Sequence, residues 1–194
     1  MRLILASASP RRRDLLRDAG IEFEVRPGQI VEEIQPGELP EEFARRAARE
    51  KATLVAAVSP HGGLVLGADT VVVVDGQTLG KPCDREDATR MLRLLSGRSH
   101  QVHTGICLVR APHEIVALKH ETTLVTFREL DEDEIRQYVE SGEPWDKAGA
   151  YAIQGLASKF VTRISGCYSN VVGLPVALVY EVLKPLMEEE GSRQ

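Results

Sequence analysis

Two arginines stand at the start of a predicted helix, where positive charge is unfavourable. Arg11 and Arg12 follow Ser9, a candidate N-cap, and Pro10 in the first helical position. Each cation there opposes the helix dipole at a cost of ~0.3–1 kcal/mol. A bound anion would offset this cost, because Ser7 and the free N–H groups of the helix start can hold a phosphate. The alternative is a capped helix whose arginines are solvated.

One carboxylate interrupts an apolar run. Asp69 lies in the middle of the segment 64–74, which is otherwise built of apolar and small residues and Thr70. Burying a carboxylate is costly unless it is paired, hydrogen-bonded or bound to a metal. Asp75, in contrast, is explained by the turn Asp75-Gly76. A backbone cap or an arginine pair would also account for Asp69, but its position within the strand favours a functional site.

Two lysines are further candidates for phosphate binding. Gly80-Lys81-Pro82 resembles the end of a phosphate loop, but three residues separate Gly76 from Gly80 where that loop requires four, and Pro82 replaces the hydroxyl residue. A P-loop NTPase is therefore disfavoured. Lys81 could still reach a phosphate, and Lys51 could do so from a helix end, but each can equally be a solvated lysine.

Adjacent carboxylates suggest a divalent cation. Glu32 and Glu33 could hold such an ion, or could be a solvated loop doublet. His100 and His103 are three residues apart in a predicted strand, so they point to opposite faces and do not form a metal pair. No Ser-His-Asp or Cys-His set stands out, and the histidines are interpreted as structural.

The elements that must position these residues alternate between strand and helix in the first half, while strands cluster in the middle, which predicts an α/β protein with a mixed sheet. Hydrophobic periodicity and turn residues predict strands at 3–6, 64–74, 101–109, 114–127 and 160–164. Helices are predicted at 10–19, 40–57, 84–95 and 131–141, with a Gly-rich loop at 142–155 and a last helix opened by Pro175 that frays at 188–190.

Composition restricts the class of protein. The chain has 194 residues, a net charge of −5, 43% apolar residues and 27% charged residues, and no repeat or linker divides it, so residues 1–194 are expected to form one folded domain. This negative net charge disfavours general electrostatic binding of nucleic acid. No apolar run reaches the ~20 residues of a membrane span, and the apolar stretch 3–6 is too short for a signal peptide, so a cytoplasmic protein is expected. The cysteines, Cys83, Cys107 and Cys167, are expected to be reduced.

The motifs, in their order along nearly the whole chain, resemble the Maf family of house-cleaning nucleoside triphosphate pyrophosphatases. They are L-A-S-A-S-P-R-R from Leu5, then Glu33, R-E-K-A at 49–52, G-A-D-T at 67–70, G-K-P at 80–82, L-S-G-R at 95–98, D-K-A-G-A-Y-A-I-Q-G at 146–155 and V-G-L-P at 172–175. The resemblance implies Mg²⁺- or Mn²⁺-dependent hydrolysis between the α and β phosphates. It also implies a two-lobed α/β fold with the active site in the cleft between the lobes, an architecture like that of inosine triphosphate pyrophosphatase, and a homodimer.

The resemblance also implies a set of site residues, which combines four cations with two carboxylates. They are Asp69 as proton acceptor, Lys51 and Lys81 as catalytic partners, Ser7, Arg11, Arg12, Thr70 and Gln154 on the substrate, and Glu33, with a contribution from Asp69, on the metal. Arg12, Thr70 and Gln154 are expected to set substrate specificity, and Glu32 is the alternative metal ligand to Glu33.

The same stretches are similar to the branch that acts on dTTP and UTP, including modified pyrimidine nucleotides. Three alternatives remain open: a pyrophosphatase of 7-methyl-GTP, one of ITP or XTP, and a non-enzymatic nucleotide-binding regulator of septum formation. A nucleoside triphosphate is the expected partner in each case. A link to cell division arrest is a further expectation from the resemblance.

Overall fold

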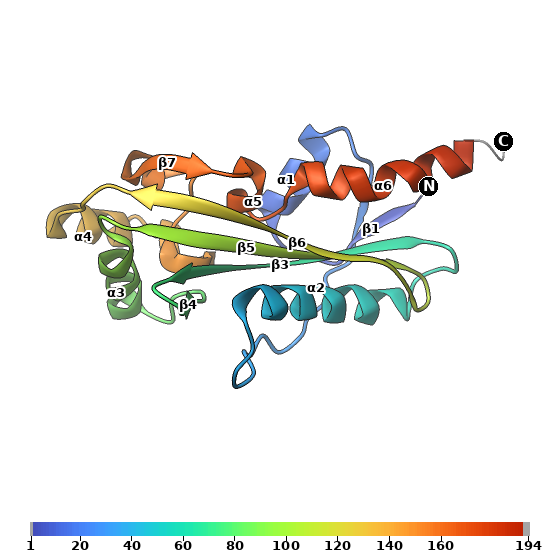
Figure 1. Cartoon of the computed structure of the whole chain (residues 1–194), viewed down its shortest axis with the longest axis horizontal. Coiled ribbons are helices and arrows are strands. Elements are labelled where there is room, and N and C mark those ends of the chain that lie inside the picture. The colour runs from blue at the N-terminus through green and yellow to red at the C-terminus, as the bar shows by residue number, and fades with distance from the viewer. Residues whose placement is uncertain (1, 192–194) are drawn as a thin grey trace. The chain divides into compact units, whose positions relative to one another are not determined.

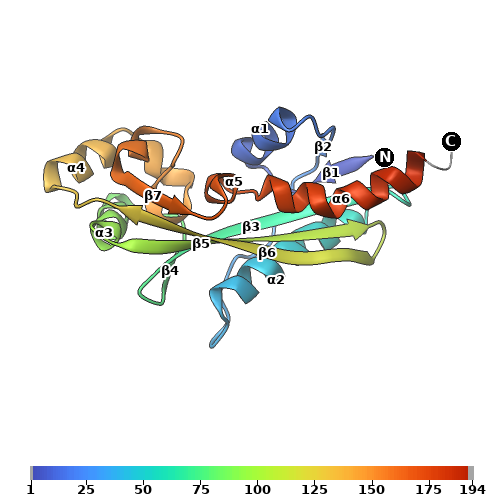
Figure 2. The same cartoon turned by 45° about the horizontal axis from the view of Figure 1, so that its top comes forward.

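A computed structural model describes residues 2–191 and shows an α/β fold (Figures 1 and 2). The strands are β1 (Leu3–Leu5), β2 (Glu24–Val25), β3 (Leu64–Val74), β4 (Gln77–Leu79), β5 (Ser99–Arg110), β6 (Glu114–Phe127) and β7 (Val161–Ser165). The α-helices are α1 (Pro10–Asp18), α2 (Pro40–Ala56), α3 (Arg85–Leu95), α4 (Glu132–Glu140), α5 (Tyr168–Val172) and α6 (Val176–Gly191). Three 3₁₀ segments are η1 (Glu143–Asp146), η2 (Ala148–Ala150) and η3 (Leu156–Phe160).

The seven strands of the described chain form one mixed sheet in the order β2-β1-β3-β5-β6-β7, with β4 paired to β3. Strand β1 is parallel to both β2 and β3, in a register that pairs Ile4 with Val65 and Leu5 with Leu66. Strands β3 and β4 are antiparallel, as are β6 and β7. The predicted mixed sheet is therefore confirmed.

The chain divides into two compact units. Unit 1 comprises residues 1–69, 104–121 and 173–194, and unit 2 comprises residues 70–103 and 122–172. Strands β3, β5 and β6 contribute residues to both units. That residues 1–194 form a single domain stays a prediction, and its ends, residue 1 and residues 192–194, lie outside the described residues.

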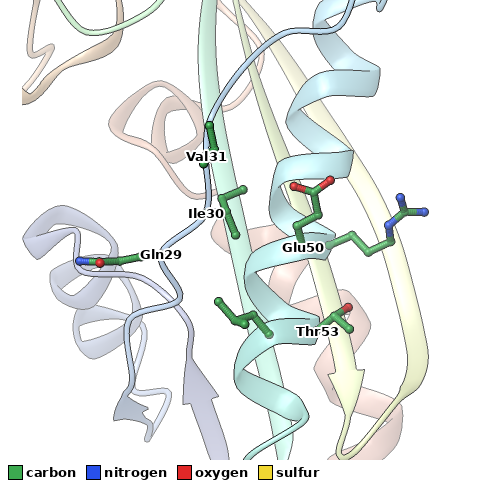
Figure 3. Close-up of a pocket in the computed structure, with 7 residues that line it drawn as sticks. Gln29, Ile30, Val31, Glu50 and Thr53 are labelled. Atoms are coloured by element: carbon green, nitrogen blue, oxygen red, sulfur yellow. The ribbon is translucent and has the colours of Figure 1, made fainter.

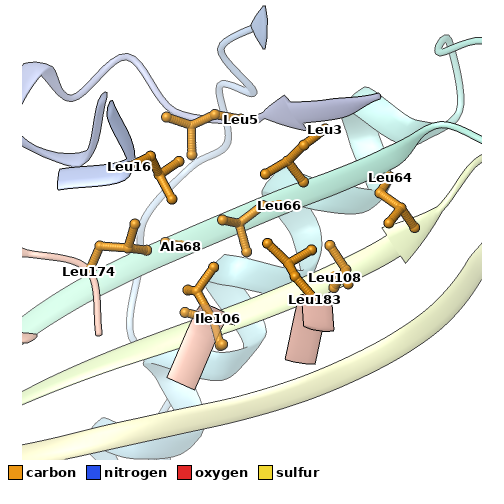
Figure 4. Packing of buried hydrophobic residues seen from close by; sticks show 11 residues of the cluster. Leu3, Leu5, Leu16, Leu64, Leu66, Ala68, Ile106, Leu108, Leu174 and Leu183 are labelled. Carbon is orange, nitrogen blue, oxygen red and sulfur yellow. The ribbon is translucent and has the colours of Figure 1, made fainter. Parts of the chain in front are cut away.

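Unit 1 has a hydrophobic core on each face of its part of the sheet. Consecutive side chains of a strand point to opposite faces, so Leu3 and Leu5 of β1 join one core and Ile4 joins the other. The first core packs Leu16 of α1 and Leu183 of α6 against β1, β3 and β5 (Figure 4). The second core packs α2 against the same strands, so α2 covers the face opposite to α1 and α6 (Figures 1 and 2).

Helix α2 lies directly on the backbone of two strands because both carry glycine at the contact. A Cβ atom on Gly67 of β3 would lie 2.2 Å from the carbonyl oxygen of Ala48, and one on Gly105 of β5 would lie 2.2 Å from that of Ala44. No side chain fits in either position. This close approach fixes the height of α2 over β3, the strand that carries Asp69.

Unit 2 is held by an aromatic cluster and by two capped helices. The rings of His100, Phe127 and Tyr151 meet edge to face with centroids 4.9–5.3 Å apart, and His100 Nε2 lies 2.8 Å from the Tyr151 hydroxyl. Asp84 caps α3 by accepting from the amide of Asp87, and Asp131 forms a capping box with Glu134 at α4. These local signals account for the predicted helix starts in this unit.

Most predicted elements are confirmed, including the hairpin at Asp75 and Gly76, both of which have positive φ. The prediction of a Gly-rich loop at 142–155 is wrong in part, because the 3₁₀ segments η1 and η2 form within this stretch. The last helix does not fray at 188–190 but continues to Gly191. Strand β2 and helix α5 were not predicted, since each has at most five residues and no periodic pattern.

Within the described residues, no helix is both long enough and apolar enough to cross a membrane. The three cysteines are free, as predicted.

Candidate active site

A buried lysine lies between two carboxylates in unit 1. Lys51 Nζ, on α2, is 2.5 Å from Asp69 Oδ1 of β3 and 2.6 Å from Glu32 Oε1 of the segment between β2 and α2. The side chains of Lys51 and Asp69 are each 8% exposed and that of Glu32 is 40% exposed. Asp69 is thus paired, as burial of a carboxylate requires, and its partner is a lysine rather than an arginine.

Arg12 is buried beside this group at the start of α1. Its Nη1 donates to Ser7 Oγ at 3.0 Å, and its Nε donates to the carbonyl oxygen of Gly173 at 2.8 Å. Desolvation by burial lowers the pKa of Arg12, while the charges of Asp69 and Glu32 oppose that shift and Arg11 adds to it. The two carboxylates therefore act on Arg12 as well as on Lys51.

The start of α1 has the features of an anion site. Ser9 occupies the N-cap position, but its side chain makes no capping hydrogen bond, and the first turn contains no acidic residue. The N–H groups of this turn and the guanidinium of Arg12 are therefore donors near one another, with Ser7 alongside. Donors of this kind at a helix N-terminus bind phosphate.

Burial also changes the chemistry of Asp69. Desolvation raises its pKa above the ordinary value, and the charges of Lys51 and Arg12 act in the opposite direction. A carboxylate with a raised pKa is a stronger base than an exposed aspartate, and such shifts are common at catalytic sites. Asp69 is thus suited to accept a proton from a water molecule.

Two carboxylates of the cluster have the chemistry to bind a divalent cation. Glu32 and Asp69 both direct a carboxylate oxygen at the same positive charge, the Lys51 ammonium. Mg²⁺ is commonly held by one or two carboxylates together with substrate phosphates. Within residues 2–191, no group of three or more His, Cys, Asp or Glu side chains could hold a metal alone. The two carboxylates, directed at one point, fit a cation that is shared with a phosphate.

The structure brings together part of the predicted site. Ser7, Arg12, Lys51 and Asp69 lie in one cluster, joined by Glu32. Glu33 does not join it: within the described chain its exposed side chain makes no hydrogen bond or ion pair, and its backbone carbonyl accepts from Arg46. The choice of Glu33 as the metal ligand stays a prediction, and the geometry favours its alternative, Glu32.

The remaining predicted residues belong partly to unit 2. Arg11 lies half-buried in α1, next to Arg12, in unit 1. Thr70 follows Asp69 in β3, Lys81 is exposed after β4, and Gln154 is exposed between η2 and η3; all three belong to unit 2. Their roles stay predictions.

One contact of the cluster could not be found by reasoning from residue types. The carbonyl of Gly173 accepts from Arg12 across 161 positions of sequence. A backbone acceptor leaves no signal in its residue type. The sequence pointed to this region only through the motif V-G-L-P at 172–175, which is one of the motifs of the family resemblance.

Comparisons with known proteins identify relatives of this chain. A family model described as "Maf-like protein" matches residues 2–186. A protein of Koribacter versatilis named dTTP/UTP pyrophosphatase is 53% identical over 95% of this chain and 94% of its own. Proteins with the same name are 53% identical in Symbiobacterium thermophilum, over 93% of this chain and 92% of their own, and 54% identical in Syntrophomonas wolfei, over 92% and 94%.

A solved structure with a looser likeness is the nucleoside-triphosphatase, or dITP/XTP pyrophosphatase, of Mycobacterium abscessus. It is 18% identical over 66% of this chain and 73% of its own, with a TM-score of 0.39. A likeness at this level carries no argument about fold or substrate. The family is identified by the family model and by the relatives of about 50% identity.

Proposed function

Because the chain belongs to the Maf-like protein family, we propose that it hydrolyses dTTP and UTP to the nucleoside monophosphate and pyrophosphate. The relatives that carry the name dTTP/UTP pyrophosphatase match more than nine-tenths of the chain at about half identity. The observation that carries the proposal in the structure is the buried cluster of Arg12, Lys51 and Asp69, in which a base lies beside two cations.

In the proposed mechanism Asp69 accepts a proton from the attacking water. Phosphoryl transfer depends mainly on positioning and on neutralisation of charge, so the protein has to supply little more than a base that orients the water and accepts its proton. Lys51, held 2.5 Å from Asp69, keeps this carboxylate ionised and in place. In this place the carboxylate can orient the water towards a phosphorus atom.

Arg12, Ser7 and the N–H groups at the start of α1 bind the phosphates. Arg12 is held by Ser7 and by the Gly173 carbonyl, so little conformational freedom is left to lose on binding. Arg11 adds charge from the same turn. Donors placed before the reaction stabilise the charge that develops on the phosphate oxygens.

Glu32 and Asp69 would hold a divalent cation together with the substrate. Glu33, the ligand predicted from the sequence, is the other candidate for the place of Glu32. When bound there, Mg²⁺ or Mn²⁺ would neutralise part of the negative charge of the phosphates. The carboxylate oxygens of Glu32 and Asp69 already converge on one cation, since both lie 2.5–2.6 Å from Lys51 Nζ.

Three residues of unit 2 complete the proposal. Lys81 would neutralise phosphate charge, while Thr70 and Gln154, with Arg12, would set the choice of nucleotide. The protein is further proposed to work as a homodimer in the cytoplasm, on nucleotides and not on nucleic acid polymers. Its three free cysteines are consistent with a reducing compartment.

The products of the reaction test the proposal. Purified protein is incubated with dTTP and Mg²⁺, and the products are separated by ion-exchange chromatography. We expect thymidine monophosphate and pyrophosphate in equal amounts. Thymidine diphosphate with inorganic phosphate would contradict cleavage between the α and β phosphates.

A further inference from the structure

Arg46 of α2 is the centre of a network that no proposed catalytic role uses. Its Nε and Nη2 bind the two carboxylate oxygens of Glu38 at 2.6 and 2.8 Å, and its Nη1 binds Glu50 Oε1 at 3.1 Å. The side chains of Arg46 and Glu38 are 17% and 10% exposed. A two-pronged pair of this kind fixes the geometry of both side chains more firmly than a single ion pair.

The same network holds the backbone next to the candidate site. Arg46 Nη2 donates to the carbonyl oxygen of Glu33 at 2.8 Å, and the carboxylate of Glu38 accepts from the amide of Gln35 at 3.0 Å. Glu33 is bonded to Glu32 in the chain, and Glu32 is the residue that reaches Lys51. The position of the Glu32 backbone is therefore tied to Arg46.

Packing gives this segment little other support. Residues 31–37 are exposed, Val31 by 74%. An open pocket of about 790 Å³ is lined by residues 29–31 on one side and by Glu50 and Thr53 of α2 on the other (Figure 3). At the near end Gly28 lies against Lys51, since a Cβ there would be 2.7 Å from the Lys51 carbonyl. The segment is thus held at Gly28 and by Arg46, and it borders the pocket between these two points.

We propose that Arg46 is a positioning residue of the pyrophosphatase: by holding Glu38 and the Glu33 carbonyl, it keeps the Glu32 carboxylate beside Lys51 and Asp69. This inference rests on the function proposed above. Without Arg46, the segment 29–38 loses its anchor on α2, and Glu32 moves away from the cation that it shares with Asp69. Ser7 and Arg12, which are proposed to donate hydrogen bonds to the phosphates, lie elsewhere in the chain and should stay in place.

The test compares Arg46→Met with the matched control Arg49→Met on the same helix. Methionine keeps an apolar stem against Phe43, over which the Arg46 guanidinium lies at 5.3 Å. Arg49 makes no hydrogen bond or ion pair within the described part of the chain. Turnover of dTTP is measured against Mg²⁺ concentration, and hydrogen–deuterium exchange is measured in the nucleotide-free protein.

For Arg46→Met we expect kcat to fall ~10- to 100-fold, the cost of a displaced catalytic group, and the half-saturating Mg²⁺ concentration to rise. Exchange should accelerate in residues 29–38 and stay unchanged in residues 43–56. Arg46→Lys, which keeps one charged bond, should give intermediate values, and Arg49→Met should match the wild type in both measurements.

Two results would overturn the inference: wild-type kcat and Mg²⁺ dependence in Arg46→Met, or lost turnover without faster exchange in residues 29–38. If Arg46→Met does not fold, Glu38→Gln weakens the two-pronged pair with an isosteric side chain while Arg46 can still reach the Glu33 carbonyl. Smaller changes in the same direction are then expected, and wild-type values in both measurements would overturn the inference. A wild-type protein that releases no pyrophosphate contradicts the proposed function itself. A fully active wild type with an unaffected Arg46→Met contradicts this inference alone.

Discussion

Asp69 is the residue whose chemistry decides the proposed reaction. It is buried, its pKa is raised by desolvation, and Lys51 lies 2.5 Å from its carboxylate. Asp69→Asn keeps the size of the side chain but removes the basic oxygen, so we expect kcat to fall by ~10²- to 10⁴-fold. Initial rates of pyrophosphate release from dTTP measure the change.

Asp75→Asn is the matched control for that variant, because Asp75 is an exposed aspartate in the turn after the same strand. It should retain wild-type turnover. Circular dichroism should show that both variants are folded. Full activity of folded Asp69→Asn would rule out Asp69 as the proton acceptor.

His100 makes the stability of the protein depend on pH. Burial lowers its pKa from 6.5 to about 4. Between these values the unfolded chain binds more protons than the folded protein, so stability increases with pH. The contribution is fully present above pH 6.5 and is lost as the pH falls towards 4, with a total of ~3 kcal/mol. Urea unfolding at pH 7 and pH 4.5 measures it.

His100→Gln tests the origin of this pH dependence. A glutamine amide can still reach the Tyr151 hydroxyl, which lies 2.8 Å from His100 Nε2, but it does not titrate. We expect a smaller loss of stability between pH 7 and pH 4.5 in this variant, whereas the exposed control His61→Gln should behave as the wild type. An identical slope in His100→Gln would assign the effect to other groups.

At the scale of elements, the close contact of α2 with the sheet places Lys51 beside Asp69. Gly105 permits this contact, because a Cβ there would lie 2.2–2.6 Å from backbone atoms of Ala44 and Arg45. Gly105→Ala should therefore displace α2 and destabilise the protein by ~1–3 kcal/mol. For a chain of this length the thermal midpoint should fall by ~2–10 °C.

Gly80→Ala is the control for the glycine substitution, since a Cβ on Gly80 meets no atom within 4 Å. Its thermal midpoint should stay close to that of the wild type. An equal midpoint for Gly105→Ala would mean that α2 can shift without cost, and the glycine would then need another explanation.

Elements could be predicted from the sequence where their signals are local. Pro10 begins α1, Asp131 caps α4, and Asp75 and Gly76 turn β3 into β4, each within a few residues of the signal. The 3₁₀ segments within 142–155 gave no such signal. Their only cues were glycines and one proline, which are equally typical of an irregular loop.

The candidate site could be predicted only in part. Arg12 and Asp69 each break a local rule, and the structure explains both by placing them in one charged cluster. The partners of that cluster depend on contacts between distant segments. Nothing in the residue types distinguishes Glu32 from Glu33, or indicates that Arg46 fixes the segment that carries them.

At the scale of the whole molecule, the protein is acidic but contains a cluster in which positive and negative charges are equal in number. The chain has a net charge of −5. The predicted site combined four cations with two carboxylates, whereas the cluster in unit 1 combines Arg12 and Lys51 with Glu32 and Asp69, two of each sign. A triphosphate adds negative charge to this neutral group, which is why a divalent cation and further cations such as Arg11 and Lys81 belong to the proposal.

Release of pyrophosphate from a panel of nucleotides distinguishes hydrolysis of dTTP and UTP from the alternative functions. The wild-type protein is assayed with dTTP, UTP, CTP, ITP and 7-methyl-GTP, each with and without Mg²⁺. We expect the highest kcat/KM for dTTP and UTP, and little release of pyrophosphate from any nucleotide without the metal. Preferential turnover of ITP or 7-methyl-GTP, or binding of nucleotides without any release of pyrophosphate, would contradict this expectation.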